Sequence, residues 1–274
     1  MSKIAAIQMA SGPNVSANLI EAGRLITAAV DAGARMVVLP ENFAVMGMTE
    51  QDKVDLRERE GDGPIQEFLS RQAARHELWI VGGTIPLEAT ASDKIRAACL
   101  VYDAAGRQVA RYDKIHLFDV ALKESGEEYN ESATIEPGEE LVVLDTPFGR
   151  LGLAVCYDLR FPELFRNLAE QGAELIALPA AFTAITGKAH WEVLVRARAI
   201  ENLCYVIASA QGGYHINGRH THGNSMIVDP WGVVLDHLPS GSGIVVADID
   251  CEQLQNRRRT FPALEHRRLP CRLS

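Results

Sequence analysis

The sequence predicts an α/β fold in which two stacked sheets carry helices on their outer faces. Short apolar segments alternate with segments of helical periodicity along all 274 residues. About a dozen strands are expected, more than one twisted open sheet usually holds. No linker-like composition shift, low-complexity tract or repeat interrupts the pattern. The simplest organisation is a single domain over residues 1–274, with residues 251–274 as a basic C-terminal extension.

The first half of the chain is predicted to open with a strand, a helix and a second strand. The apolar run at residues 4–9 is short and β-rich. Apolar side chains then recur at helical spacing from Asn14 toward Gly33, which stands where a helix C′ glycine is expected. The apolar strand at residues 36–39 ends just before Glu41. The elements expected next are a helix at residues 65–76 and strands at residues 78–85, 95–102 and 107–112.

The second half continues the same alternation. The predicted strands are residues 141–144, 150–155, 175–178, 204–209, 225–228, 233–235 and 243–249, and the predicted helices are residues 162–171 and 190–202. Two of these strands form a hairpin around the turn at residues 229–232. Helices interleaved with strands in this way favour outer helical layers over separate all-α and all-β regions.

The charge of the chain argues against a nucleic-acid partner. It has 27 Lys and Arg residues against 36 Asp and Glu residues, a formal net charge of −9, whereas nucleic-acid-binding surfaces are basic. No run approaches the roughly 18 apolar residues of a membrane-spanning helix, and the first residues have no signal-peptide hydrophobic region. We therefore expect a cytoplasmic protein with no membrane partner.

The cysteine content argues against a disulfide framework. The number is odd, the spacing is wide and no CxxC pair occurs, so neither disulfides nor a zinc site is predicted. A cysteine with a chemical role is then expected to act as a thiol. The five residues are Cys99, Cys156, Cys204, Cys251 and Cys271.

Three reactive side chains stand directly after predicted strands. Glu41 follows the second strand, Lys114 follows the strand at residues 107–112, and Cys156 follows the strand at residues 150–155. Reactive groups of α/β proteins collect where strands end at the carboxyl edge of a sheet. A lone Glu or Lys there is ordinary loop solvation, but a carboxylate, an amine and a thiol together indicate a catalytic set.

These three groups suit nucleophilic catalysis by a thiol. A cysteine with its ordinary pKa of about 8.5 needs a base or a nearby cation to react at neutral pH. Glu41 can accept the thiol proton. The ammonium of Lys114 and the backbone N–H of Tyr157 can then stabilise the oxyanion that forms when the thiolate of Cys156 attacks a carbonyl carbon.

The segments around these residues resemble signature blocks of one enzyme family. The blocks are Leu39-Pro40-Glu41, Lys114-Ile115-His116-Leu117-Phe118-Asp119, and GLAVCYDLRFPE at residues 152–163. In this order they are similar to the nitrilase, or carbon-nitrogen hydrolase, superfamily, and matching segments cover nearly the whole chain. The resemblance implies a four-layer α-β-β-α sandwich with Glu41 as general base, Lys114 as oxyanion stabiliser and Cys156 as nucleophile. It also implies no cofactor and a homodimer or higher homo-oligomer joined across helical faces.

The same resemblance implies a second glutamate after the lysine. Glu131 matches best, because it precedes Ser132 and the Pro137-Gly138 pair as in the family. Glu127 and Glu128 lie nearby and remain alternatives. The expected role of this carboxylate is to hold Lys114 and to help orient the substrate amide.

Within the superfamily, residues 116–118 and 229–232 are most similar to the branch that contains deaminated-glutathione amidase and ω-amidase. The branch implies a cysteine-dependent amidase that converts a terminal carboxamide of a small 2-oxo acid, of the deaminated-glutathione or 2-oxoglutaramate type, to a carboxylate and ammonia through a thioester. The alternatives are an N-carbamoyl or aliphatic amidase, a nitrilase, a metabolite-binding protein without activity and a redox-sensing thiol protein. Residues 211–223 depart from the usual eukaryotic pattern and leave the substrate open.

Several residues are candidates for substrate contact. Phe182 and Thr183 lie in a segment that matches the family. Arg160 follows the nucleophile by four residues and can either hold a substrate carboxylate or pair with Asp158 or Glu163 as a structural ion pair.

The segment after the predicted strand at residues 204–209 adds one more candidate. Arg219 can hold the far end of an acidic substrate. His215, His220 and His222 lie close by, but their spacing matches no metal-ligand pattern, so no metal site is predicted.

Overall fold

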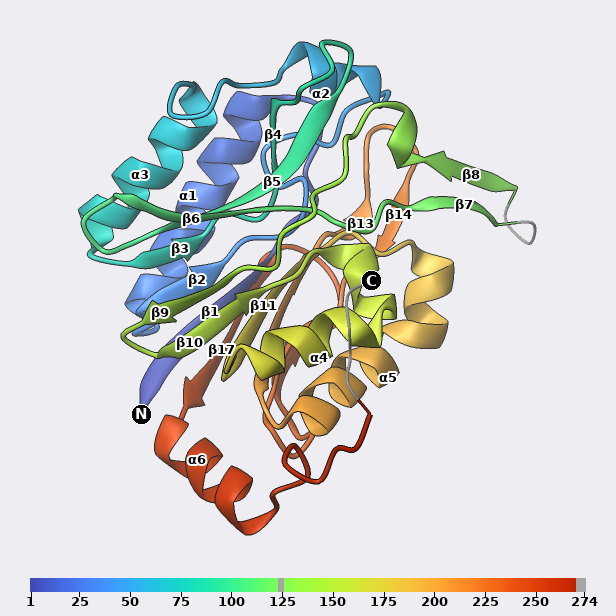
Figure 1. Ribbon diagram of the computed structural model, residues 1–274. Helices are drawn as coiled ribbons and strands as arrows, with labels where there is room; N and C mark the ends of the chain where they lie inside the picture. The colour runs from blue at the N-terminus through green and yellow to red at the C-terminus, as the bar shows by residue number, and fades with distance from the viewer. Residues whose placement is uncertain (123–125, 270–274) are drawn as a thin grey trace.

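Two β-sheets stack face to face at the centre of the computed structural model, which describes residues 1–122 and 126–269 (Figure 1). The first sheet contains β1 (Ser2–Gln8), β2 (Met36–Val38), β3 (Trp79–Val81), β4 (Ile85–Glu88), β5 (Ile95–Tyr102), β6 (Gln108–Asp113) and β17 (Gly243–Ile249). The second contains β9 (Val143–Thr146), β10 (Gly149–Leu153), β11 (Leu175–Ala180), β12 (Tyr205–Ala210), β15 (Ser225–Val228) and β16 (Val234–Leu238). Contacts of β1 with β12 and of β16 with β17 join the two sheets.

The strand order decides which strand ends meet. The first sheet has the order β17-β1-β2-β3-β5-β4, with β6 paired to β5, and the second has the order β16-β15-β12-β11-β10-β9. Strand β2 is parallel to β1 and β3, and β11 is parallel to β10 and β12. Parallel neighbours bring their carboxyl ends to one edge of the sheet, where reactive side chains collect.

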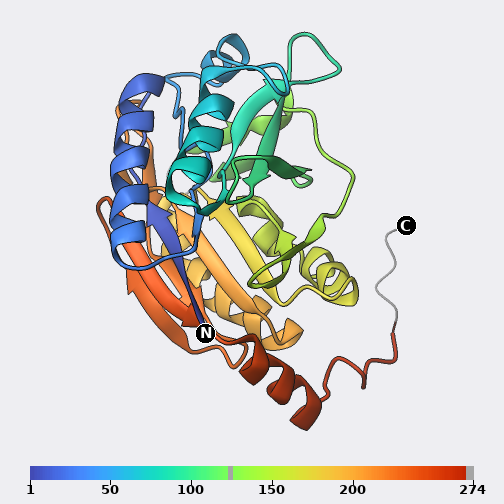
Figure 2. The ribbon, with the colours of Figure 1, turned by 90° about the vertical axis from the view of Figure 1, so that its left-hand side faces the viewer.

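Helices cover the outer faces of both sheets. Helices α1 (Val15–Asp31) and α3 (Pro64–His76) lie side by side against the first sheet, and α4 (Pro162–Glu170) and α5 (Ala184–Asn202) lie against the second (Figures 1 and 2). The layer order is therefore α-β-β-α, and the predicted fold class is confirmed. In the described residues, no helix is long and apolar enough to cross a membrane.

The alternation of side chains along β1 explains how its sheet is buried on both faces. Ile4 and Ala6 belong to the core between the sheets, whereas Ala5 and Ile7 belong to the core beneath α1 and α3. All four are fully buried. Successive strand residues point to opposite faces, so a continuous apolar run is what a doubly covered strand requires.

The helix expected after β1 begins and ends as its sequence predicts. Oδ1 of Asn14 accepts a hydrogen bond from the N–H of Ala17 at 3.0 Å, which caps the first turn. Gly33 follows the last turn with a φ of 90°, a conformation that a residue with a Cβ adopts only at a cost.

The prediction of a single strand at residues 78–85 is wrong. Strand β3 ends at Val81 and β4 begins at Ile85, with two glycines between them. Gly83 has a φ of 57°, and a Cβ there would lie 2.1 Å from the carbonyl oxygen of Pro40. The break lets this turn pack directly against the backbone that leads into Glu41.

Other differences concern short elements that sequence periodicity does not show. The structure adds α2 (Gln51–Asp55) and two hairpins, β7 (Asp119–Leu122) with β8 (Glu127–Asn130) and β13 (Gly212–Tyr214) with β14 (His220–His222). Helix α5 begins at Ala184, six residues before the predicted start, because Thr183 caps it through a hydrogen bond from the N–H of Thr186 at 3.4 Å. The hairpins lie outside the main sheets, so their strands lack long apolar runs.

The basic C-terminal segment begins as a helix. Helix α6 (Cys251–Thr260) buries Leu254, and Arg258 donates hydrogen bonds to the carbonyl oxygens of Leu203 and Ala173 at 3.0 and 2.7 Å. Arg258 thus fixes the helix to the turn after α5. Cys271 and the last residues of the predicted extension lie outside the described residues.

Candidate active site

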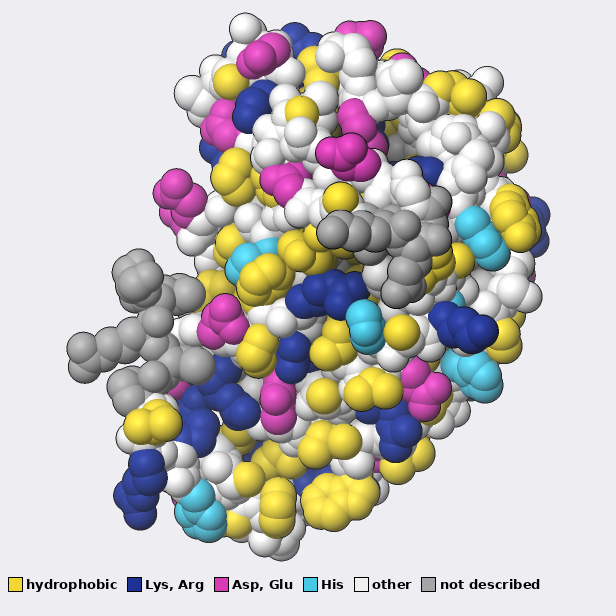
Figure 3. Space-filling view, turned by 90° about the vertical axis from the view of Figure 1, so that its right-hand side faces the viewer, with side chains coloured by type: hydrophobic (Ala, Val, Ile, Leu, Met, Phe, Trp, Pro, Cys, Tyr) yellow, Lys and Arg dark blue, Asp and Glu magenta, His cyan; other side chains and the backbone are white. Residues whose placement is uncertain are grey.

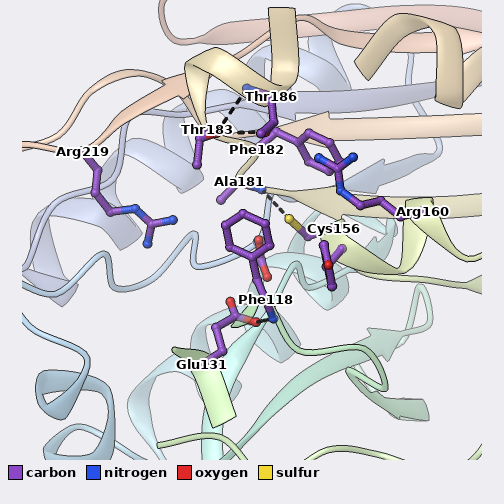
Figure 4. Close-up of a pocket in the computed structure, with 11 residues that line it drawn as sticks. Phe118, Glu131, Cys156, Arg160, Ala181, Phe182, Thr183, Thr186 and Arg219 are labelled. Carbon is purple, nitrogen blue, oxygen red and sulfur yellow. Dashed lines mark hydrogen bonds between the residues drawn. The ribbon is translucent and has the colours of Figure 1, made fainter. Parts of the chain in front are cut away.

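A pocket at the ends of β2, β10 and β11 collects most of the predicted site residues (Figure 4). Lys114, with 1% of its side chain exposed, lies beneath the surface of the pocket. The residues that line the pocket are Glu41, Phe118, Glu131, Cys156, Tyr157, Arg160, Ala181, Phe182, Thr183, Thr186 and Arg219.

The ammonium group of Lys114 lies between two carboxylates. Its Nζ atom donates to Oε1 of Glu41 at 2.8 Å and to Oε2 of Glu131 at 2.7 Å. Glu41 is 3% exposed, and its backbone carbonyl accepts a hydrogen bond from the amide of buried Gln211 at 3.0 Å. The loop that follows β2 is thereby tied to the end of β12.

Of the three glutamates considered from sequence, Glu131 carries the carboxylate that contacts Lys114. It opens the short 3₁₀ helix Glu131–Ala133, directly after β8, and its Oε2 atom also accepts the N–H of Phe118 at 2.8 Å. Glu127 and Glu128 lie in β8, and Glu128 is exposed. The geometry therefore favours Glu131 over these alternatives.

Charge pairing in the pocket shifts the pKa values of Lys114 and Glu131 further than burial shifts them in the opposite direction. Burial alone lowers the pKa of Lys114, but the carboxylates of Glu131 and Glu41 raise it well above its ordinary value. Burial likewise raises the pKa of Glu131, yet the neighbouring Lys114 and Lys53 bring it below its ordinary value. Lys114 is thus held as an ammonium and Glu131 as a carboxylate.

Cys156 stands at a strained turn. It begins the 3₁₀ helix Cys156–Arg160 with a φ of 49°, a left-handed conformation that costs a non-glycine residue roughly 1–3 kcal/mol and is common at functional sites. The thiol is 8% exposed, and Sγ accepts the N–H of Ala181 at 3.5 Å. Burial, followed by the charge of Glu41, raises its pKa well above the ordinary value, although Lys114 opposes this. The thiol is therefore protonated at rest.

Asp158 fixes this turn, which the sequence did not reveal. Its carboxylate is fully buried and accepts four hydrogen bonds. The donors are the hydroxyl of Tyr112 at 2.6 Å, the N–H of Val155 at 2.8 Å, and Nδ1 and the N–H of His116 at 2.7 and 3.1 Å. Because Tyr112 and His116 flank Lys114, Asp158 joins the segment that carries the amine to the turn that carries the thiol.

Arg160 does not make the ion pair that was one of its two predicted roles. Asp158 is committed elsewhere, and the described partner of Arg160 is His190, whose Nδ1 lies 3.2 Å from Nη1. Its guanidinium lies over the rings of Phe182 and Tyr157, with Cζ at 5.1 and 5.7 Å from their centres. This cation–π stacking orients the guanidinium at the pocket wall.

Arg219 lines the opposite side of the pocket, as Figure 4 shows. Its Cζ atom lies 5.0 Å from the centre of the Tyr129 ring. Phe118, Ala181 and Thr186 also line the pocket and were not singled out from the sequence. No sequence signal marks them beyond their closeness to Lys114 and Thr183, because their exposure to the pocket is set by tertiary packing.

The neighbouring histidines have structural partners. Nδ1 of His215 lies 2.8 Å from the carbonyl of Ser11 and Nε2 lies 2.7 Å from Oγ1 of Thr221. His220 stacks on Tyr214 with ring centres 4.0 Å apart. Among the described residues, no group of three or more His, Cys, Asp or Glu side chains is arranged to hold a metal ion.

Known proteins of similar sequence and structure share this fold. A family model described as carbon-nitrogen hydrolase matches residues 3–259. A deaminated glutathione amidase from Synechocystis sp. is 46% identical over 266 residues, which cover 96% of this chain and 97% of that protein. The crystal structure of the Caenorhabditis elegans NitFhit protein superposes with a TM-score of 0.89 at 37% identity, covering 97% of this chain and 65% of that chain.

An amidase from Nesterenkonia sp. superposes with a TM-score of 0.79 at 27% identity, covering 96% of this chain and 98% of that chain. It is described with acrylamide added at its active-site cysteine. The fold and the pocket are those of a hydrolase that acts on carbon–nitrogen bonds. The chain belongs to the carbon-nitrogen hydrolase family, as its signature blocks predicted, and it is an amidase.

Proposed function

We propose that the chain is a cysteine-dependent amidase for a 2-oxo acid amide of the deaminated-glutathione type. The observation that carries this proposal is that Glu41, Glu131 and Cys156 line one pocket, with Lys114 hydrogen-bonded to both glutamates beneath its surface. Glu41 is the general base, Cys156 the nucleophile and Lys114 the oxyanion stabiliser. Glu131 holds Lys114 and helps to orient the substrate amide.

The reaction proceeds in two halves. Glu41 takes the thiol proton while Sγ of Cys156 bonds to the amide carbon, and the negative charge on the carbonyl oxygen is met by Lys114 and the N–H of Tyr157. Glu41 then gives the proton to the leaving nitrogen, the C–N bond breaks and a thioester remains. A water molecule, deprotonated by Glu41, attacks the thioester and releases the acid and the free thiol.

A base is required because the thiol is protonated at rest. Burial and the charge of Glu41 hold the pKa of Cys156 well above neutral pH. The proton that opposes nucleophilic attack is thus taken by the same carboxylate that raises the pKa. No cofactor is needed for these steps.

The proposed substrate class rests on the relatives and on the residues that line the pocket. In deaminated glutathione, the scissile amide joins a 2-oxoglutaryl group to the nitrogen of cysteinylglycine, so cleavage releases cysteinylglycine. The ammonia expected from the sequence for both amides therefore applies only to 2-oxoglutaramate. Both share an acyl group that ends in a 2-oxo acid. Arg160, oriented by Phe182, and the N-terminus of α5 with its cap Thr183 provide the positive charge that this carboxylate requires.

A substrate panel tests the proposal. Formation of 2-oxoglutarate from deaminated glutathione and from 2-oxoglutaramate is measured beside N-carbamoyl amino acids, aliphatic amides and nitriles, with Cys156→Ala as the blank. We expect the 2-oxo acid amides to have the highest kcat/KM. Carbon dioxide release or nitrile consumption at a higher rate would instead identify an N-carbamoyl amidase or a nitrilase.

The helical face of the second sheet supports a homodimer. Val193 and Ile200 of α5, Trp231 and Phe261 are between 49% and 69% exposed, and the rings of Trp231 and Phe261 lie 5.7 Å apart. Figure 3 shows hydrophobic side chains over the lower half of the face that carries α5. Exposed apolar residues gathered in this way mark interaction surfaces. Ile200→Glu should convert a dimer to a monomer in sedimentation velocity, and a wild-type monomer contradicts the proposed dimer.

We also propose a cytoplasmic location. The mechanism needs a reduced Cys156, and the four cysteines among the described residues all carry free thiols. Fractionation of cells with an antibody against the chain tests this location.

A further inference from the structure

A groove adjoins the pocket, and Arg219 lies in the walls of both. Tyr129 and Asn217 line the groove beside it, together with three glutamates, Glu50, Glu127 and Glu128, so Arg219 is the one cation among the described residues that line it. Because Arg219 lines both hollows, a substrate that reaches out of the pocket on this side passes its guanidinium.

The guanidinium of Arg219 is held in place while part of its hydrogen-bonding capacity is unused. Its Nε atom is buried and has no hydrogen-bond partner in the part of the chain that the structure describes. Its Nη1 atom lies 3.8 Å from Sδ of Met46 and 3.9 Å from Oε1 of Glu50, both long contacts. Burying a donor without a partner is costly, and the planar fork of an arginine fits a carboxylate.

The surroundings leave this cation available to a ligand. Glu50 is committed to Lys53, whose Nζ lies 2.7 Å from its carboxylate. The loop that carries Arg219 is fixed, because Asn217 donates to the carbonyl of Gly47 at 2.6 Å and accepts the N–H of Arg219 at 3.0 Å. Arg219 is thus a preorganised positive charge at the junction of pocket and groove.

Arg219 and Arg160 belong to different parts of the pocket wall and so lie at different ends of a bound substrate. Arg219 packs on Met46, in the loop that follows Glu41, whereas Arg160 belongs to the turn of Cys156. Figure 4 shows the two arginines on opposite sides of Cys156. With the acyl carboxylate placed at Arg160, as in the proposed function, the leaving group extends toward Arg219 on the opposite side.

We infer that Arg219 and the adjoining groove form a subsite for the terminal carboxylate of a peptide-like leaving group. This inference rests on the proposed function and narrows it, since cysteinylglycine carries such a carboxylate and ammonia does not. The subsite makes the enzyme prefer an amide whose leaving amine ends in an anion over the primary amide of the same acid.

The test compares kcat/KM for three substrates: deaminated glutathione, its C-terminal amide and 2-oxoglutaramate. For Arg219→Met, the ratio of kcat/KM for deaminated glutathione to that for 2-oxoglutaramate should fall about tenfold or more, as expected for loss of a charged hydrogen-bonded pair. Amidation of the glycine carboxylate should lower kcat/KM of the wild type by a similar factor and have little further effect in the variant. Arg24→Met, at an exposed arginine on α1, should keep the wild-type ratio.

The outcomes separate this inference from the proposed function. An unchanged ratio in Arg219→Met, or additive losses from the substitution and the amidation, would overturn the subsite. Failure of the wild type to cleave either 2-oxo acid amide faster than Cys156→Ala would overturn the proposed function and the subsite together. If Arg219→Met does not fold, the ratio of wild-type kcat/KM for deaminated glutathione to that for its C-terminal amide alone decides whether the subsite binds the terminal carboxylate.

Discussion

The hydroxyl of Tyr112 donates a hydrogen bond to Oδ2 of Asp158 at 2.6 Å, and both side chains are buried. Tyr112 lies in β6, two residues before Lys114, and Asp158 lies two residues after Cys156. A single buried contact therefore joins the segment of the amine to the segment of the thiol. The chemistry depends on the distance between the amine of Lys114 and the thiol of Cys156, because Lys114 must stabilise the oxyanion that forms when Cys156 attacks.

Asp158→Asn should lower kcat at least about tenfold with a smaller change in KM, because an amide has one acceptor oxygen and turns its N–H₂ toward other donors. The free energy of unfolding should fall by about 1–3 kcal/mol for each donor left without a partner. Steady-state kinetics and thermal unfolding measure both effects. Asp145→Asn, at an exposed aspartate, serves as the control. A folded Asp158→Asn variant with wild-type kcat contradicts a positioning role.

Glu131→Gln should lower kcat at least about tenfold, since the substitution removes one of the two charges that hold the ammonium of Lys114. Glu128→Gln, at an exposed position three residues earlier, should keep wild-type kinetics. The pair distinguishes two of the three glutamates that the sequence left open. Equal losses in both variants, or a loss confined to Glu128→Gln, would reject Glu131 as the second glutamate of the site.

Lys114→Met should lower kcat about 10²–10³-fold, the effect of removing one donor from an oxyanion site. It also leaves the carboxylates of Glu41 and Glu131 close together without a cation, so the melting temperature should fall. Lys114→Arg keeps the charge and should retain more stability. Lys3→Met, at an exposed lysine of β1, is the matched control. Turnover in a folded Lys114→Met variant at the wild-type rate excludes the proposed role.

Glu41→Gln should have opposite effects on thiol reactivity and on turnover. Burial raises the pKa of Cys156 first and the charge of Glu41 adds to it, so removal of that charge lowers the pKa. The pH at which alkylation of Cys156 by iodoacetamide reaches half its maximum should therefore shift to lower pH, while kcat falls because the base is lost. A shift to higher pH would show that Glu41 stabilises the thiolate rather than the thiol.

Sequence reasoning located the parts of the site that follow regular strands. Glu41 and Cys156 each follow an apolar segment, and Lys114 follows the strand predicted at residues 107–112. A strand that stops at a reactive side chain is visible without a structure. The α-β-β-α layers follow in the same way from strands that are apolar on both faces, such as β1.

What the sequence left open depends on contacts between distant segments. Glu131 follows the β7–β8 hairpin, whose short strands have little apolar periodicity, so its register against Lys114 is set only by the fold. The role of Asp158 requires knowing that Tyr112 and His116 lie beside it. The buried donor of Arg219 likewise exists only because Met46 and Tyr129 pack around it.

Attack by Cys156 on the acyl carbon is the central claim, and detection of the acyl-enzyme tests it most directly. Wild-type protein mixed rapidly with deaminated glutathione, quenched in acid and examined by intact and peptide mass spectrometry should carry a 2-oxoglutaryl thioester on Cys156, with one equivalent of cysteinylglycine released before steady state. Cys156→Ala should form neither the adduct nor 2-oxoglutarate. Formation of 2-oxoglutarate by Cys156→Ala at the wild-type rate, or an adduct on another residue, would contradict the account.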